Sequence, residues 1–300
     1  IGVADVTTSL ALQSGATLIN NGTVVLQTGT VTLGGSTAAS ASSLVNNGTL
    51  VVQDTIGDSA ALANSNDGGY GTFQNNGTVD VQSGRFDVAV SPAAATMGTF
   101  NVAAGATLVL GQPYTFASGA QLTGAGVVSL YTGTFQGPIT FGGTLQANSL
   151  EVDGAASVAN LTMSGGTLSG SGMLTLTGVS KIDSSSASVQ SLVFAGTTTL
   201  SASSLKNTFD GTAATIASGG VVNMQGLSGL MLKNGATLTN NGTLSGSAPT
   251  IQGFGTAVGV SGTFTNNGVG DIEAEVSAGT RARIGKGDLV YLEELTGKGH

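Results

Sequence analysis

Few side chains in this sequence could perform acid–base or metal chemistry. Its 300 residues include 16 Asp and Glu, 8 Lys and Arg, one His and no Cys. Because His300 is the only imidazole, the chain contains no His-based nucleophilic triad and no imidazole metal cluster. The lack of Cys excludes thiolate metal sites and a disulfide framework. Catalysis or metal binding would therefore have to depend on carboxylates.

One candidate pair is Glu151 and Asp153, two residues apart in a segment that alternates like a strand. Both side chains would project from the same face, where they could act as acid and base in polysaccharide cleavage. Surface charge is the favoured interpretation. Sites that cleave sugars usually add aromatic platforms and basic groups, whereas the chain has no Trp, 4 Tyr and three Arg (Arg85, Arg281 and Arg283).

A second group of carboxylates, Asp54, Asp58 and Asp67, lies in a long stretch between two repeats. Their oxygens could hold Ca²⁺, but a solvated loop is the favoured interpretation. The nearby "GGYGTF" at 68–73 resembles the calcium-binding glycine-rich nonapeptide of secreted toxins, although Phe73 stands where that motif needs Asp. We therefore expect no metal, no cofactor and no catalytic residue.

The charge balance also restricts the partners. The net charge is -8, and the eight basic residues form no cluster that could hold a phosphate backbone, so we expect no nucleic-acid partner. No apolar stretch is long enough to cross a bilayer, so we expect no membrane insertion by this segment.

The residues that position any site belong to a repeated ten-residue frame. Clear copies are "GATLINNGTV" from 15, "ASSLVNNGTL" from 41, "YGTFQNNGTV" from 70, "GAQLTGAGVV" from 119, "GGTLSGSGML" from 165, "GATLTNNGTL" from 235 and "SGTFTNNGVG" from 261. Looser copies start at 97, 142, 189 and 213, which makes successive starts 22 to 29 residues apart. A period in this range is typical of repeat architectures.

The frame has the pattern of a short strand. Its fourth position is always apolar, and its third is Thr or Ser in ten of eleven copies. We therefore predict an all-β fold, a parallel β-helix (β-solenoid) of roughly 11–12 coils of about 24 residues each. Residues 1–300 would form one solenoid segment of a longer protein, and its final part at 271–300 would be irregular, since it holds ten of the 24 charges.

The triplet "NNG" falls at the same place in five of the frames. Asn20, Asn46 and Asn75 should then stack in successive coils, and Asn240 should stack with Asn266. A carboxamide can donate to one neighbouring coil and accept from the other, so we predict side-chain amide ladders with a structural role. The Gly that follows is expected at positive φ.

Four of these triplets continue to Thr and so match the N-glycosylation consensus, as does Asn160. We interpret the matches as a by-product of turn chemistry. The matching residues are Asn21, Asn47, Asn76 and Asn241.

The repeated "GATLxNNGTL" frames, with "LTGAGVVSL" and "LSGSGMLTL", resemble the repeats of bacterial surface β-helix proteins. These are the passenger regions of autotransporters and the shafts of filamentous-haemagglutinin-type adhesins. The resemblance implies a right-handed helix, an extracellular or cell-surface location and a structural or adhesive role, with surface glycans or host and matrix proteins as partners. The sequence also leaves open whether copies of the chain associate end to end or in another way. The resemblance transfers no functional residue.

Two other interpretations stay open from the sequence. One is a polysaccharide-cleaving enzyme, a lyase or glycosidase on the same scaffold, with Glu151 and Asp153 as its carboxylates. The other is ice binding, which needs flat Thr-x-Thr ranks and is disfavoured by the uneven spacing of the frames. The "KGD" at 286–288 resembles short integrin-type motifs, but a tripeptide carries almost no weight.

Overall fold

The chain is a β-solenoid of parallel strands, which confirms the predicted fold class. The computed structural model describes residues 3–7, 9–27, 29–53, 60–64, 70–202, 207–226, 229–246, 250–254, 262–269, 272–277 and 280–292. About 10 turns follow one another about 22 residues apart, slightly fewer and shorter than expected. The described residues contain one helical element, the 3₁₀ turn η1 (Ala38–Ser40), which Thr37 caps. No helix among them has the length and apolar character needed to span a bilayer.

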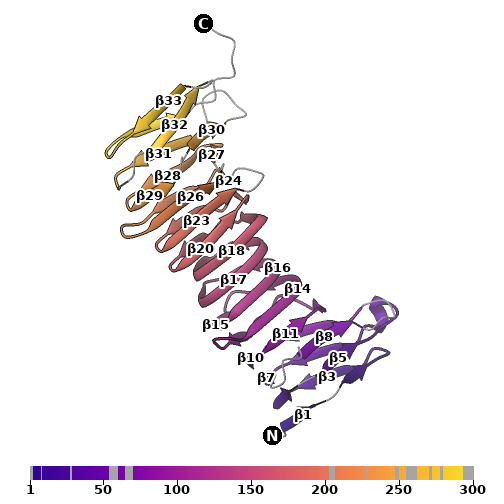
Figure 1. The fold of residues 1–300 in the computed structure, drawn as a ribbon. Coiled ribbons are helices and arrows are strands. Elements are labelled where there is room, and N and C mark those ends of the chain that lie inside the picture. Colours follow the sequence, from indigo (N-terminus) through magenta and orange to yellow (C-terminus); the bar gives the residue numbers. More distant parts are fainter. Residues whose placement is uncertain are drawn as a thin grey trace. The chain divides into compact units, whose positions relative to one another are not determined.

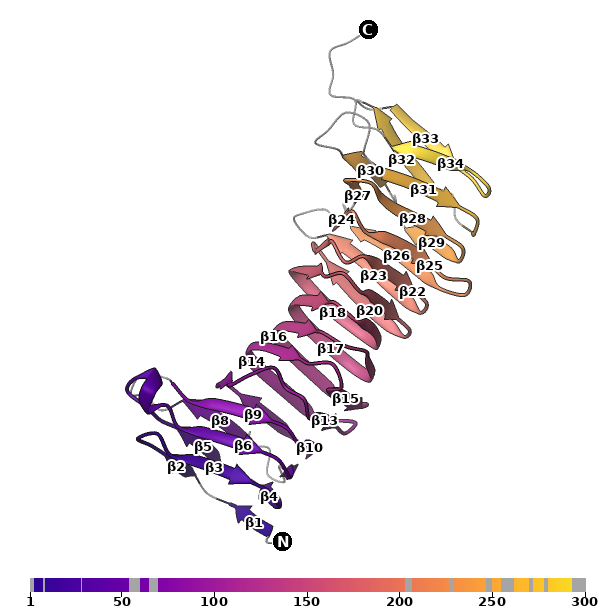
Figure 2. The ribbon, with the colours of Figure 1, turned by 180° about the vertical axis from the view of Figure 1, so that it is seen from behind.

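The chain divides into two compact units, Ile1–Ala147 and Asn148–His300. In the first unit the strands form three columns of parallel pairs, which can be followed in Figures 1 and 2. The first column contains β1 (Val3–Val6), β4 (Thr23–Leu26), β7 (Thr49–Gln53), β10 (Thr78–Ser83), β13 (Thr99–Val102) and β15 (Gln121–Gly124). The second contains β2 (Leu10–Leu12), β5 (Thr30–Leu33), β8 (Ala60–Asn64), β11 (Arg85–Val88), β14 (Thr107–Phe116) and β16 (Val127–Phe135). The third contains β3 (Thr17–Asn20), β6 (Ser43–Asn46), β9 (Thr72–Asn75) and β12 (Ser91–Pro92).

The strand β17 (Ile139–Val152) contains the boundary between the units, and the second unit continues with β18 (Ala155–Ser169). Different parts of β18 begin three columns. The first continues through β19 (Met173–Leu176), β22 (Ser191–Phe194), β25 (Ala213–Ile216), β28 (Ala236–Asn240) and β31 (Gly262–Asn266). The second continues through β20 (Val179–Asp183), β23 (Thr197–Ala202), β26 (Val221–Gly226) and β29 (Thr243–Gly246). The third continues through β21 (Ser186–Ala187), β24 (Asn207–Asp210), β27 (Gly229–Lys233), β30 (Thr250–Phe254) and β32 (Ile272–Ser277).

The last strands of the second unit reverse direction. The strand β33 (Thr280–Ile284) pairs antiparallel with β32, and β34 (Leu289–Leu292) pairs antiparallel with β31. The parallel stack of this unit therefore ends in antiparallel strands, where the sequence led us to expect an irregular segment.

Each unit has its core inside the coils, because alternate side chains are buried along strands such as β10 and β13 in the first unit and β22 in the second. In the first unit the register places Leu50, Val79, Phe100 and Leu122 in one buried row. The rings of Phe100 and Phe116 meet edge to face with centroids 5.9 Å apart, a geometry that adds to the hydrophobic gain. Burying a side chain of this size contributes about 1.5 to 3 kcal/mol relative to leaving it exposed.

The register confirms the frames that contain NNG. Leu18, Leu44 and Phe73 pair in one column, and Leu238 pairs with Phe264. Identical corner sequences therefore occupy equivalent places in successive coils.

Two of the looser frames are wrong, and so are two of the clear ones: Leu122 pairs with Phe100, and Leu168 pairs with Ala187 and not with Leu192. Phe100 pairs with Val79 and not with Phe73, because "GTF" at 98–100 continues the strands that follow the NNG corners. In the copy from 213, Ala214 and not Ile216 pairs with Leu238, which is a shift of two residues. The alternation of apolar and polar side chains is unchanged by such a shift, so the pattern alone could not detect it.

Candidate functional site

The structure places Glu151 and Asp153 on the exposed outside of the coil, with the buried Val152 between them. One oxygen of Asp153 accepts hydrogen bonds from the amide and the hydroxyl of Ser171, 3.2 and 3.4 Å away. That carboxylate therefore joins its own coil to the next one. Among the residues that the structure describes, no three His, Cys, Asp or Glu side chains lie close enough together to hold a metal ion.

The second group of carboxylates, Asp54, Asp58 and Asp67, lies outside the described residues, as do Gly68 and Gly69. The described residues of the "GGYGTF" stretch, 70–73, include two that hold the coil together. Phe73 is buried in β9, and the amide of Gly71 donates to the side-chain oxygen of Asn64 at 2.8 Å.

Arg85 forms an ion pair with Asp87, two residues away on β11. Two guanidinium nitrogens donate to the two carboxylate oxygens at 2.8 and 2.9 Å. Because the arginine is half exposed, such a pair contributes at most about 1 kcal/mol.

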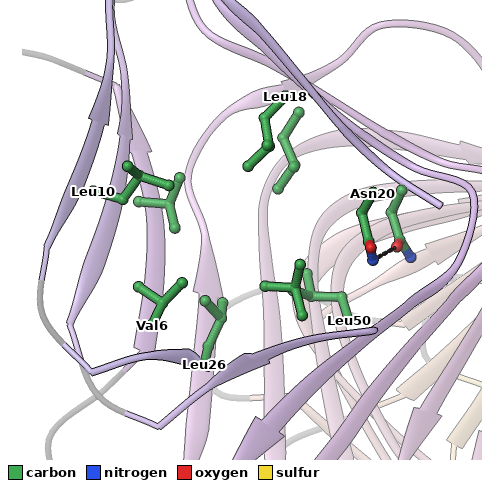
Figure 3. Close-up of a pocket in the computed structure, with 10 residues that line it drawn as sticks. Val6, Leu10, Leu18, Asn20, Leu26 and Leu50 are labelled. Carbon is green, nitrogen blue, oxygen red and sulfur yellow. Dashed lines mark hydrogen bonds between the residues drawn. The ribbon is translucent and has the colours of Figure 1, made fainter. Parts of the chain in front are cut away.

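The most regular polar feature of the first unit is the stack of Asn20, Asn46 and Asn75. The amide nitrogen of Asn20 donates to the side-chain oxygen of Asn46, and that of Asn46 donates to Asn75, both at 2.8 Å. All three side chains are buried, at 6 %, 0 % and 1 % exposure. The side-chain bonds that the shared frame position predicts are therefore present. Figure 3 shows the first of them at the edge of an apolar interior.

The same amides also fasten the corner to the following strand. Besides its bond to Asn46, the nitrogen of Asn20 donates to the carbonyl of Thr49, and that of Asn46 donates to the carbonyl of Thr78, both at 2.9 Å. Each buried carboxamide thereby satisfies its donors without water, which removes the main cost of placing it inside the coil.

A second row of asparagines runs along the outside of these corners in the opposite direction. Asn76 donates to Asn47, and Asn47 donates to Asn21, both at 3.0 Å. The inner row donates toward higher residue numbers, whereas this exposed outer row donates toward lower ones. The consensus residues for glycosylation in this unit are therefore already bonded to one another.

The glycines of the triplets do not have the conformation we expected. Gly48 and Gly77 are absent from the residues with positive φ. A Cβ on Gly48 would collide with the carbonyl oxygen of Gly22 in the coil beneath, and one on Gly77 would collide with that of Gly48. Glycine is needed at these corners because the neighbouring backbone approaches closely, not because the chain turns left-handed.

The second unit repeats the corner at Asn240 and Asn266, which are both fully buried. Asn240 donates to Asn266 at 2.8 Å, and the outer Asn267 donates back to Asn241 at 3.1 Å. Below Asn240 the same row holds Ile216. The amide ladder therefore occupies a core position that is apolar elsewhere in the stack.

A turn that contains the "KGD" residues closes this second ladder. The amide of Gly287, at φ 91, donates to the carbonyl of Asn266, and the amide of Asn266 donates to the carbonyl of Asp288 at 3.0 Å. The carboxylate of Asp288 accepts from the amide of Gly285 at 2.7 Å and so fixes the turn. Through these contacts, residues 286–288 cap the corner at Asn266.

Sequence reasoning missed a further polar chain on the outside of the first unit. Gln53 donates to Gln82, and Gln82 and Asn101 both donate to Asp80, with distances of 2.6 to 2.7 Å. Thr123 extends the chain to Asn101 at 3.1 Å. The residue types differ from coil to coil, so no repeated motif signals it. The signal would have been their spacing from the "GT" at 48–49, 77–78 and 98–99, since Asp80 and Asn101 stand three residues after its Gly and Gln53 and Gln82 stand five after it.

Threonine ranks of the kind that bind ice are incomplete where the register can be followed. Thr23, Thr49, Thr78 and Thr99 share one outward row, but the row two residues further on holds Val25, Val51, Asp80 and Asn101. In the second unit Thr237 pairs with Thr263 and Thr239 with Thr265, and the coil before them contributes Ala213 and Thr215. Neither column presents a continuous array of Thr-x-Thr pairs.

A small apolar pocket lies inside the first coils (Figure 3). Its lining is aliphatic except for two amides of the inner row: Val6, Leu10, Leu18, Asn20, Val24, Leu26, Val31, Leu44, Asn46 and Leu50. These lining side chains include no ionisable group, so they provide packing and not acid–base chemistry.

No protein-family model, curated protein sequence or solved structure matches the chain.

Proposed function

We propose that this chain is a structural or adhesive module, a stiff β-helical segment displayed on the surface of a bacterium or secreted from it. The observation that carries the proposal is how the outward polar groups are used. In both units they bond to equivalent residues of neighbouring coils, as in the outer rows formed by Asn21, Asn47 and Asn76 and by Asn241 and Asn267. Such rows stiffen a stack and present a hydrated face of repeated amides and hydroxyls.

The proposed partners are surface glycans or host and matrix proteins. Amide and hydroxyl groups match the hydrogen-bonding chemistry of sugars, and the low charge of the chain suits binding without steering by ions. The location outside the cell follows from the resemblance of the repeats to bacterial surface proteins, and it is part of the same proposal.

The alternative is cleavage of a polysaccharide by Glu151 and Asp153. Both carboxylates are exposed, which would allow access to a polymer. Asp153 is engaged by Ser171, so it would serve better in positioning than in proton transfer.

One experiment separates the two. The chain would be screened against an array of glycans and matrix proteins, with binding and product release measured in the same samples. We expect binding without cleavage, unchanged in the double variant E151Q/D153N. Cleavage that this double variant abolishes would replace the structural proposal with the enzyme. An absence of both binding and cleavage would remove the adhesive part of the proposal.

A further inference from the structure

The sequence contains six Asn-Gly dipeptides, at Asn21, Asn47, Asn76, Asn234, Asn241 and Asn267. In such a dipeptide the backbone nitrogen of Gly can attack the side-chain carbonyl of Asn, because no Cβ hinders the approach. Five of the six belong to NNG corners, and Asn234 belongs to the turn between β27 and β28. The structure gives these two settings different hydrogen bonding.

In the stacked corners the attacking nitrogen is already engaged. The amide of Gly48 donates to the carbonyl of Asn20 at 2.9 Å, and that of Gly77 donates to the carbonyl of Asn46 at 2.8 Å. The side chains of Asn47 and Asn76 are held in the outer row. Both reactive groups must therefore leave their partners before they can meet.

The turn at Asn234 is arranged differently. Asn234 and Gly235 are both exposed, and their φ angles of 50° and 77° lie in the left-handed region. Within the part of the chain that the structure describes, the amide of Gly235 has no hydrogen-bond partner. The side-chain nitrogen of Asn234 donates to Asp210 at 2.6 Å.

We infer that Asn234 is a site of spontaneous deamidation and that the stacked corners protect Asn47 and Asn76 from the same reaction. The nitrogen of Gly235 forms a bond to Cγ of Asn234 and loses its proton to water or hydroxide, while the side-chain nitrogen leaves as ammonia. Water then opens the resulting five-membered imide. Addition at Cγ gives aspartate, and addition at the main-chain carbonyl gives isoaspartate. Water is the only co-reactant.

The product would strain its surroundings. The new carboxylate at position 234 would lie against Asp210, and like charges at this distance repel. The same turn joins β27 to the preceding coil, since the amide of Gly211 donates to the carbonyl of Lys233 at 3.0 Å. Deamidation is therefore expected to loosen this corner of the second unit.

The test is peptide mapping by mass spectrometry of the whole chain after storage in mildly alkaline buffer, with isoaspartate distinguished by fragmentation. Loss of even one hydrogen bond before attack corresponds to roughly tenfold in rate, so Asn234 should be modified about tenfold faster than Asn47 or Asn76. The same chain in urea is the control for intrinsic reactivity, and there the three sites should react at similar rates.

Equal rates at Asn234 and Asn47 in the folded chain, or an unmodified Asn234, would overturn the inference. The variant N234D reports the consequence of the reaction separately. It should unfold at lower urea concentration than the parent, and the double variant D210N/N234D should recover most of the loss. A loss that D210N does not relieve would refute the repulsion.

Discussion

The two amide ladders have the same internal bonds but different surroundings. In the first unit, three coils contribute Asn20, Asn46 and Asn75, and the ladder ends where Asn75 donates to the carbonyl of Thr99 at 3.1 Å in a stack that continues. In the second unit the ladder has two members, and a turn closes it beyond Asn266. The hydrogen bonds within a corner are therefore the same in both units, and only the contacts at the end of each ladder differ.

The largest expected effect comes from removing a central amide. Asn46 bonds to an asparagine on each side, whereas Asn240 bonds to one and has Ile216 on the other side. Asn46→Ala leaves buried amide groups of both neighbours without that partner, so it should destabilise the first unit by about 2 to 4 kcal/mol. Asn240→Ala should cost about half as much. Urea unfolding would measure both.

The exposed Asn47→Ala serves as the matched control, and it should cost only a few tenths of a kcal/mol. Equal losses for Asn46→Ala and Asn47→Ala would show that the buried ladder contributes no more than the exposed one.

Substitution of the corner glycines tests whether the two ladders share one geometry. A Cβ on Gly48 or on Gly268 would meet the carbonyl oxygen of the glycine one coil below, Gly22 or Gly242. Gly48→Ala and Gly268→Ala should therefore each destabilise by about 1 to 3 kcal/mol, and by similar amounts. Gly111→Ala is the control, since its Cβ would lie 3.5 Å from the nearest atom. A cost that differs strongly between the two corners would contradict a shared geometry.

The core of the first unit also contains a titrating group. Tyr114 is 2 % exposed and donates to the carbonyl of Val90 at 3.2 Å, and burial raises the pKa of its phenol well above 10. The protonated phenol contributes its full stabilisation below the unfolded pKa of about 10. Above that pH the stabilisation falls by about 1.4 kcal/mol per pH unit until the folded pKa is reached. Unfolding of this unit should therefore become easier above pH 10.

Comparison of Tyr114→Phe with Tyr131→Phe isolates this effect. Tyr131 is 57 % exposed, so its removal should leave the alkaline loss unchanged, whereas Tyr114→Phe should reduce it. If both variants follow the parent above pH 10, the buried phenol is not the group responsible.

The smallest effect concerns the cap of the second ladder. Asp288→Ala removes the acceptor for the amide of Gly285, a turn contact that contributes about 1 kcal/mol. Amide hydrogen exchange at Asn266 and Gly287 should become faster, while exchange in the first unit should not change. Asp288→Asn keeps an acceptor oxygen and should preserve most of the protection. Unchanged exchange in Asp288→Ala would show that the carboxylate does not stabilise the cap.

The sequence was sufficient for the fold class and for the Asn ladders, because identical triplets at one frame position must stack when coils are parallel. It was insufficient for Phe100 and Ile216, since an alternating pattern is satisfied equally well after a shift by any even number of residues, here six and two. The role of Gly48 was also misjudged. A close approach between coils is a contact in space, and it leaves no mark in the local sequence.

The opposite directions of the inner and outer asparagine rows have an electrostatic consequence. Aligned amides in a single row would add their dipoles, as peptide groups do along an α-helix, and would leave partial charges at its two ends. Here each coil adds one amide pointing each way, so the two contributions largely cancel. Corners of this kind can therefore be added one after another without leaving partial charges at the two ends of the asparagine rows.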